Sequence, residues 1–123
     1  MLYFAAKMQI VFVVSPDWTL RTAVRAELRE AGVDALGLET ADDVGKALAR
    51  GMAPSVVVID GAELENSSAR EALANLARHV TVIVVDSRVT PAPELIGAER
   101  LHRPLRVRDI VTRVLARLVA LAR

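Results

Sequence analysis

The chain has 123 residues, which suits one domain with a single well-filled core and leaves little room for a second domain. A net charge of +1 argues against a strong field for nucleic acid or membrane, and the absence of cysteine excludes disulfides and thiolate metal sites. The composition, 53% hydrophobic but only 3% aromatic, is typical of the Val, Leu, Ile and Ala core of a helix-covered parallel sheet.

The N-terminal seven residues are apolar but too short for a signal peptide, and no stretch approaches the ~20 apolar residues of a membrane-spanning helix. We therefore expect a soluble, cytoplasmic protein that forms one domain over residues 1–123. Residues 1–7 are predicted to be a disordered or loosely attached extension.

The first predicted βα unit begins with the apolar strand Gln9–Val14. Ser15 and Pro16 are expected to start a helix, because serine can cap free N–H groups and proline suits the first helical position. Asp17 favours the same helix end, and Gly32 is placed to stop the helix. Three arginines, Arg21, Arg25 and Arg29, are predicted to face outward from this helix.

The second unit is predicted as the strand Val33–Leu38 and a helix that reaches Arg50, with Thr40 and Asp43 at its start in a capping arrangement. The third strand, Ser55–Ile59, is closed by Asp60. The remaining predicted elements are a loop over 61–68, a helix over Ala69–Ala77, a strand at Val80–Val85, a strand at Glu99–His102 and a last helix at Val107–Ala122. Any helix over Glu94–Ala98 is expected to be short, because the prolines before it restrict the backbone.

This alternation predicts a doubly wound α/β fold, in which the carboxyl ends of parallel strands meet at one edge. Four landmarks of the sequence are specific when their order and spacing are taken together. They are Val13-Val14 followed by Arg21, Val57-Val58-Ile59-Asp60, Ile83-Val84-Val85, and Gly97-Ala98 running to Arg103-Pro104. On these landmarks the chain resembles a bacterial response-regulator receiver domain over nearly its whole length. The resemblance implies a flavodoxin-like (CheY-like) five-stranded parallel sheet of order 2-1-3-4-5 with helices on both faces.

In that family the phosphoacceptor aspartate, matched here by Asp60, takes a phosphoryl group from a histidine kinase. Mg²⁺ assists, bound by an acidic pair after the first strand. The place of that pair is taken by Ser15 and Pro16, and Mg²⁺ sites usually include carboxylates. Asp17, one position later, is either a substitute ligand or an ordinary residue at a helix start. We expect a degenerate phosphorylation site.

Two further positions depart from the family. Asp86 stands in place of a small hydroxyl residue, and Arg103 stands in place of a lysine that pairs with the phosphoryl group. One hypothesis is that Arg103 bridges Asp60 and Asp86 through its planar fork and forms a permanent ion-paired plug. The alternative is that Asp86 caps the following loop through Ser87 and Thr90, while Arg103 is solvated.

The resemblance also implies a change in signal relay, because Arg100 replaces an aromatic residue that turns inward on activation. On the last helix, Arg106, Arg113, Arg117 and Leu118 are interface candidates, and the family implies a possible homodimer through this helix. The other interpretation is a core-facing helix with solvated arginines. Nucleic-acid binding by this domain is disfavoured, because the arginines have few aromatic neighbours.

These residues are compatible with three functions. The first is a receiver-like signalling domain, non-enzymatic and without a cofactor, that acts by phosphorylation-independent contact with a histidine kinase, an output domain or another protein. The second is a functional receiver that is phosphorylated at Asp60 with Mg²⁺ as cofactor. The third is a small metal-dependent enzyme using Asp60 and Asp86, with His102 as a third group.

Overall fold

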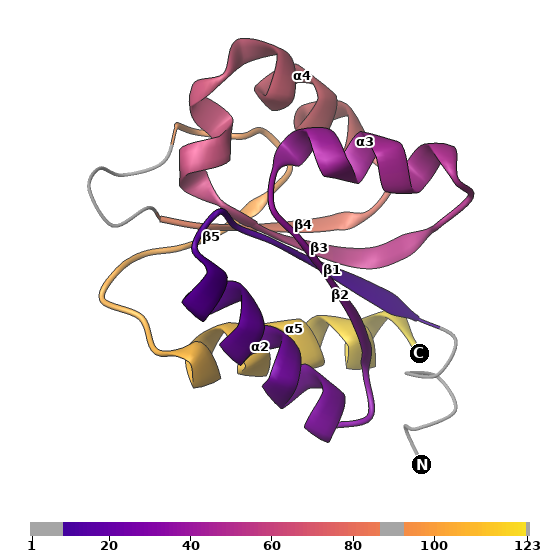
Figure 1. Ribbon diagram of the computed structural model, residues 1–123, viewed down its shortest axis with the longest axis vertical. Helices are drawn as coiled ribbons and strands as arrows, with labels where there is room; N and C mark the ends of the chain where they lie inside the picture. Colours follow the sequence, from indigo (N-terminus) through magenta and orange to yellow (C-terminus); the bar gives the residue numbers. More distant parts are fainter. Residues whose placement is uncertain (1–8, 87–92, 123) are drawn as a thin grey trace.

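The computed structural model describes residues 9–86 and 93–122 and places one parallel sheet between two layers of helices (Figure 1). The strand order is β2-β1-β3-β4-β5, as predicted. The elements are β1 (Ile10–Val14), α2 (Trp18–Glu30), β2 (Asp34–Leu38), α3 (Ala41–Ala49), β3 (Pro54–Asp60), the 3₁₀ helix η1 (Gly61–Glu65), α4 (Ser67–Leu76), β4 (Thr81–Val85), β5 (Glu99–Leu101) and α5 (Val107–Leu121).

The sheet is apolar on both faces because helices cover both. Helices α2 and α5 lie on one side of the sheet, and α3 and α4 lie on the other (Figure 1). In β1, Val11 and Val13 pack toward α2 and α5, whereas Phe12 and Val14 pack toward α3 and α4. All four are at most 2% exposed. A strand buried on both faces needs a continuous apolar run, which explains why the sequence signal was strong.

Capping residues determine where the first two helices, α2 and α3, begin. Thr40 caps α3 in a capping box with Asp43, as predicted. For α2, the prediction that Ser15 and Pro16 begin the helix is wrong. The cap is Asp17, whose side chain accepts hydrogen bonds from the backbone N–H groups of Thr19 and Leu20. Because Asp17 caps the helix, the Ser15 side chain can form hydrogen bonds at the carboxyl edge of the sheet.

Two of the three arginines predicted to face outward on α2 fold back onto the backbone. Arg21 Nη1 donates to the Ser15 carbonyl at 2.6 Å, and Arg25 Nε donates to the Ala35 carbonyl at 3.0 Å. Both are half-buried, and only Arg29 is exposed. Their alkyl stems can cover apolar surface while the guanidinium groups satisfy carbonyls at the first two strands.

The sequence allows at most a short helix over Glu94–Ala98, and the structure has no helix there. This segment forms a turn in which the Ala98 N–H donates to the Leu95 carbonyl at 3.2 Å, and Gly97 adopts φ +86°. That left-handed conformation interrupts helical geometry. The predicted extension 1–7 and the predicted Ser87 and Thr90 contacts lie outside the described residues. Within the part that the structure describes, no helix is long and apolar enough to cross a bilayer.

Candidate functional site

The carboxyl ends of β1 and β3 place Ser15 and Asp60 side by side. Val14 pairs with Ile59 in the sheet, so the next residue of each strand reaches the same edge. Ser15 Oγ donates to Asp60 Oδ2 at 2.9 Å, and the Ala62 N–H donates to Asp60 Oδ1 at 3.0 Å. Ser15 is 2% exposed and Asp60 is 8% exposed. Each oxygen of the Asp60 carboxylate thus accepts a hydrogen bond from a neutral donor.

Neither of the two residues that follow Ser15 provides a ligand for a metal ion beside the Asp60 carboxylate. Pro16 is exposed and has neither an N–H group nor a ligating side chain. Asp17 Oδ1 is used to cap α2, at 3.0 Å from the Thr19 nitrogen and 3.3 Å from the Leu20 nitrogen. Of the two interpretations of Asp17, the geometry agrees with the ordinary residue at a helix start.

A second carboxylate, Asp86, follows β4 and is 7% exposed. Arg100 Nε donates to its Oδ1 at 2.9 Å, and the Nδ1 atom of His102 lies 3.1 Å from its Oδ2. The pairing of Val85 with Leu101 brings these residues together, because Arg100 and His102 flank Leu101 and point to the same face of the sheet. The Asp86 carboxylate is therefore held by side chains of the neighbouring strand and the loop that follows it.

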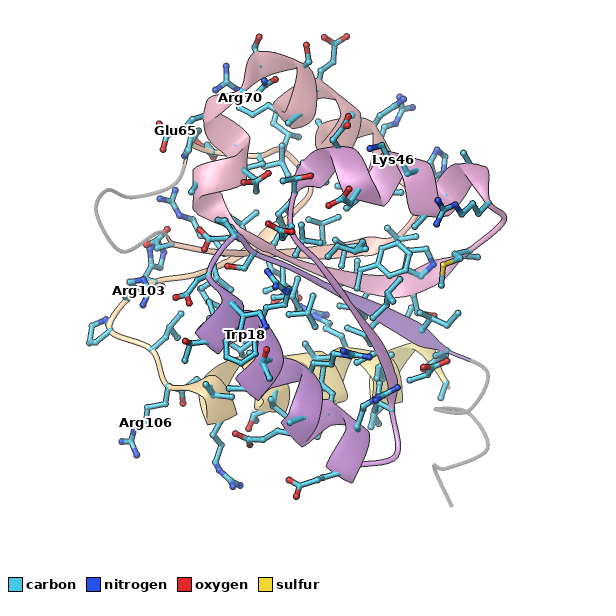
Figure 2. The ribbon with its side chains drawn as sticks, in the orientation of Figure 1. Trp18, Lys46, Glu65, Arg70, Arg103 and Arg106 are labelled. Carbon is cyan, nitrogen blue, oxygen red and sulfur yellow. The ribbon has the colours of Figure 1, made fainter. Side chains whose placement is uncertain are left out.

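Arg103 makes a different contact from the one predicted. Its Nε donates to the backbone carbonyl of Asp86 at 2.7 Å, and the predicted bridge from Arg103 to the carboxylates of Asp60 and Asp86 is wrong. Figure 2 shows Arg103 at the left edge of the molecule, where the chain passes from β5 toward α5. The ion pair of Asp86 is made by Arg100, which sequence reasoning treated only as a missing aromatic residue. The detectable signal was two basic residues, Arg100 and His102, spaced by two on one strand face.

The donor set does not fit the Mg²⁺ ion that the fold family implies. A hard cation needs several oxygen ligands, usually with more than one carboxylate. Here Asp60 has a hydroxyl neighbour, Asp17 caps a helix and Asp86 pairs with a guanidinium group. Among the described residues, no group of three His, Cys, Asp or Glu side chains is arranged to hold a metal ion. The third alternative, a metal-dependent enzyme, gains no support from this geometry.

The last helix is tied to the edge strand by charge. Arg113 Nε lies 3.4 Å from one carboxylate oxygen of Glu99, and Arg117 pairs with the other. Leu118 is 5% exposed and belongs to the core beneath α5, so its prediction as an interface residue is wrong. Arg106 is exposed and points away from the domain (Figure 2). Of the four interface candidates, Arg106 is the most available to a partner.

Comparison with known proteins identifies the fold. No family model matches the sequence, and no curated protein matches it. The structure is similar to the receiver domain of the Francisella response regulator 1452, with 14% identity and a TM-score of 0.70 over 91% of this chain and 98% of that chain.

Two further solved structures agree. A response regulator receiver protein from Burkholderia phymatum shares 21% identity at a TM-score of 0.67, covering 89% of this chain and 94% of that chain. The N-terminal domain of a response regulator/sensory box/GGDEF 3-domain protein from Carboxydothermus hydrogenoformans shares 13% identity at a TM-score of 0.73, covering 93% and 97% respectively. The chain therefore has the fold of a response-regulator receiver domain.

Proposed function

We propose that this chain is a receiver-like signalling domain of the bacterial two-component type that acts by protein contact without phosphorylation. The observation that carries this proposal is the environment of the two edge carboxylates. Asp60 accepts a hydrogen bond from Ser15 in the place of a metal-binding acid, and Asp86 forms an ion pair with Arg100 in the place of a phosphoryl-binding hydroxyl.

Electrostatics supports the proposal. A phosphoryl group on Asp60 is anionic and needs a nearby cation to offset its repulsion from surrounding acids. Two unit charges about 4 Å apart interact by about 4 kcal/mol at an effective dielectric of 20. The loss of acidic Mg²⁺ ligands and the gain of Asp86 both act against phosphorylation. Arg100 is already engaged by Asp86, so part of the local positive charge is compensated before any phosphoryl group arrives.

A functional receiver is the second candidate, and one observation favours it. Asp60 keeps the phosphoacceptor position at the end of β3 and pairs with no described lysine or arginine side chain. Its carboxylate accepts hydrogen bonds from two neutral donors, the Ser15 hydroxyl and the Ala62 N–H group, so no described cation would have to be displaced by a phosphoryl group. The two candidates therefore differ in whether Mg²⁺ and a phosphoryl donor reach this carboxylate productively.

The proposed domain is non-enzymatic and cytoplasmic, and its partner is a protein such as a histidine kinase or the output domain of a larger regulator. A homodimer through α5 is a further proposal that comes from the resemblance. Because Leu118 is buried in the core, the contact in such a dimer would be made by Arg106 and by the half-exposed Leu121 near the helix end.

Acetyl phosphate with Mg²⁺, followed by intact mass spectrometry, tests phosphorylation directly. We expect no phosphorylated species from the natural chain. The double substitution Ser15→Asp with Pro16→Asp restores an acidic pair and is the matched gain-of-function control. A phosphorylated natural chain whose modification maps to Asp60 would overturn the proposal in favour of the functional receiver.

A further inference from the structure

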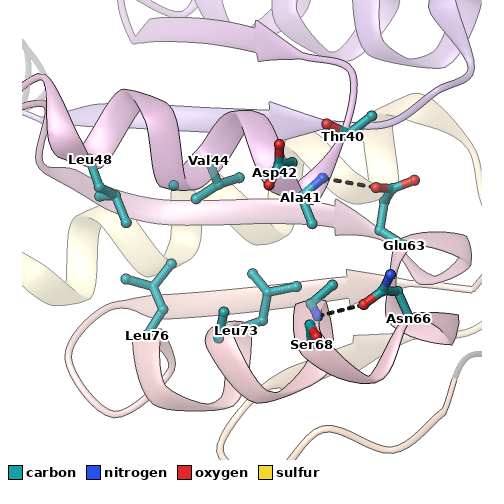
Figure 3. Close-up of a pocket in the computed structure, with 13 residues that line it drawn as sticks. Thr40, Ala41, Asp42, Val44, Leu48, Glu63, Asn66, Ser68, Leu73 and Leu76 are labelled. Carbon is teal, nitrogen blue, oxygen red and sulfur yellow. Dashed lines mark hydrogen bonds between the residues drawn. The ribbon is translucent and has the colours of Figure 1, made fainter.

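The two faces of the sheet are covered unequally. Helices α2 and α5 pack closely against each other, whereas α3 and α4 make few mutual contacts. Between α3 and α4 lies a groove of about 630 Å³. Figure 3 shows Leu48 and Leu76 at one end of this groove and Glu63 and Asn66 at the other.

The groove has an apolar floor and low walls. Val44 and Leu73 form buried surface between the helices, at 3% and 2% exposed, and Leu48 is 36% exposed. The walls carry small residues, including Gly45 on α3 and Ala72 on α4. A Cβ atom added at Gly45 meets nothing within 4 Å, so space above this wall is open. A partner backbone can approach closely at small residues.

The polar end of the groove carries negative charge. Among the described residues, those that line the groove include the acids Asp42 and Glu63 and no lysine or arginine. Glu63 Oε1 accepts a hydrogen bond from the backbone N–H group of Ala41 at 2.8 Å. Asp42 is 87% exposed in its side chain and pairs with Lys46 at 3.8 Å. Such exposed i,i+4 pairs are weak, so an incoming cation can compete with Lys46 for this carboxylate.

We propose that the α3–α4 groove docks an amphipathic helix of a partner protein, with leucine-type anchors near Leu48 and Leu76 and arginine or lysine near Asp42 and Glu63. The proposal rests on the proposed function, since it names the surface through which protein contact occurs. Charge complementarity selects a basic partner over an acidic one. The apolar floor supplies the burial that anchors such helices in grooves.

Length and polarity define the partner more closely. Helix α3 has nine residues and is therefore about 13 Å long, which matches anchors at positions i, i+4 and i+7 of a partner helix. Both α3 and α4 begin at the carboxyl edge of the sheet, near Glu63 (Figure 3). A partner helix running antiparallel to them places its C-terminal end there. Cations are favourable at a helix C-terminus, so its basic residues stabilise both the helix and the contact.

The test uses two synthetic helical peptides of roughly 14 residues with leucine at i, i+4 and i+7. One carries two C-terminal arginines, and its matched control carries two glutamates at the same places. Each is titrated into the isotopically labelled full chain, and backbone amide shifts are followed by NMR. We expect the arginine peptide to shift Gly45, Leu48 and Ala72 and to bind at least roughly tenfold more tightly than the glutamate peptide.

Two substitutions locate the binding on the protein. Ala72→Leu fills the groove from an exposed position and is expected to weaken the arginine peptide roughly tenfold. Ala26→Leu makes the same change at an exposed position on α2 and is expected to leave binding unchanged. Asp42→Asn is expected to reduce the preference for the arginine peptide.

The proposal is overturned if neither peptide shifts the groove amides at millimolar concentration, or if both bind equally. It is also overturned if dilution of the chain alone shifts those amides, because the occupant is then a second copy. None of these results bears on phosphorylation of Asp60. A negative result for helix docking in the groove is therefore distinguishable from a negative result for the proposed phosphorylation-independent function. The acetyl phosphate experiment tests that function separately.

Discussion

Replacing Arg100 with alanine tests how the second carboxylate at the sheet edge is stabilised. Arg100 Nε lies 2.9 Å from Asp86 Oδ1, and the two side chains are 27% and 9% exposed. A hydrogen bond to a charged group contributes about 1.5–3 kcal/mol, whereas a fully exposed ion pair contributes about 0–1 kcal/mol. Because Asp86 is buried and Arg100 is partly solvated, we expect Arg100→Ala to lower the free energy of unfolding by about 2 kcal/mol.

Urea denaturation followed by far-UV circular dichroism measures this change. A double-mutant cycle with Asp86→Asn isolates the pair, and we expect a coupling energy of about 1.5 kcal/mol. Arg108→Ala is the matched control. Arg108 is 83% exposed in its side chain and 4.0 Å from Glu27, so its loss is expected to change stability by at most about 0.5 kcal/mol.

The comparison with Arg103 decides between two arrangements. Arg103 donates to a backbone carbonyl, and its replacement by alanine is expected to cost about 1 kcal/mol. The reasoning is refuted if Arg103→Ala destabilises more than Arg100→Ala, or if the cycle between Arg100 and Asp86 shows no coupling.

Three other predictions follow from local geometry. Ser15→Asp places a second buried carboxylate beside Asp60 and is expected to lower the free energy of unfolding by about 2–4 kcal/mol in EDTA, with partial recovery in millimolar Mg²⁺. An equal loss of stability in Ser15→Asn would show that the shape of the side chain, and not its charge, is the cause. Asp17→Ala removes the cap of α2 and is expected to lower the unfolding free energy by about 1 kcal/mol, while the exposed Thr19→Ala in the same turn changes it little. Gly45→Ala, at an open helical position, is expected to raise stability by about 0.5–1 kcal/mol in the same urea assay, and a loss of stability would contradict the open space above α3.

The strands and their parallel pairing were predictable because the physics is local and repetitive, whereas the strand order was implied by the resemblance to receiver domains. Continuous Val and Ile runs indicate strands buried on both faces, and helices between them require parallel pairing. The turn at Glu94–Ala98 was not predictable beyond the expectation that any helix is short, since its residues carry no sign that Gly97 adopts a left-handed conformation. That choice depends on the surrounding chain.

The side-chain partners at the site were less predictable than the positions. The positions of Asp60 and Asp86 at the carboxyl edge of the sheet were predicted correctly, because the ends of β3 and β4 determine them. Which arginine reaches Asp86 depends on the register of β4 with β5 and on side-chain rotamers, and a three-residue strand gives little pattern from which to read them. The same limit applied to Ser15, whose hydroxyl donates to Asp60 Oδ2 and accepts a hydrogen bond from the N–H group of Asp17, the residue that caps α2.

We propose that the carboxylate of Asp60 does not operate a Mg²⁺-dependent phosphoryl switch. An NMR titration of backbone amides with Mg²⁺ and then beryllofluoride is the decisive measurement. We expect the amides around Asp60 and Asp86 to stay unchanged through both additions. Shifts that begin at these residues and spread to α5 would contradict the claim and identify a working phosphorylation switch.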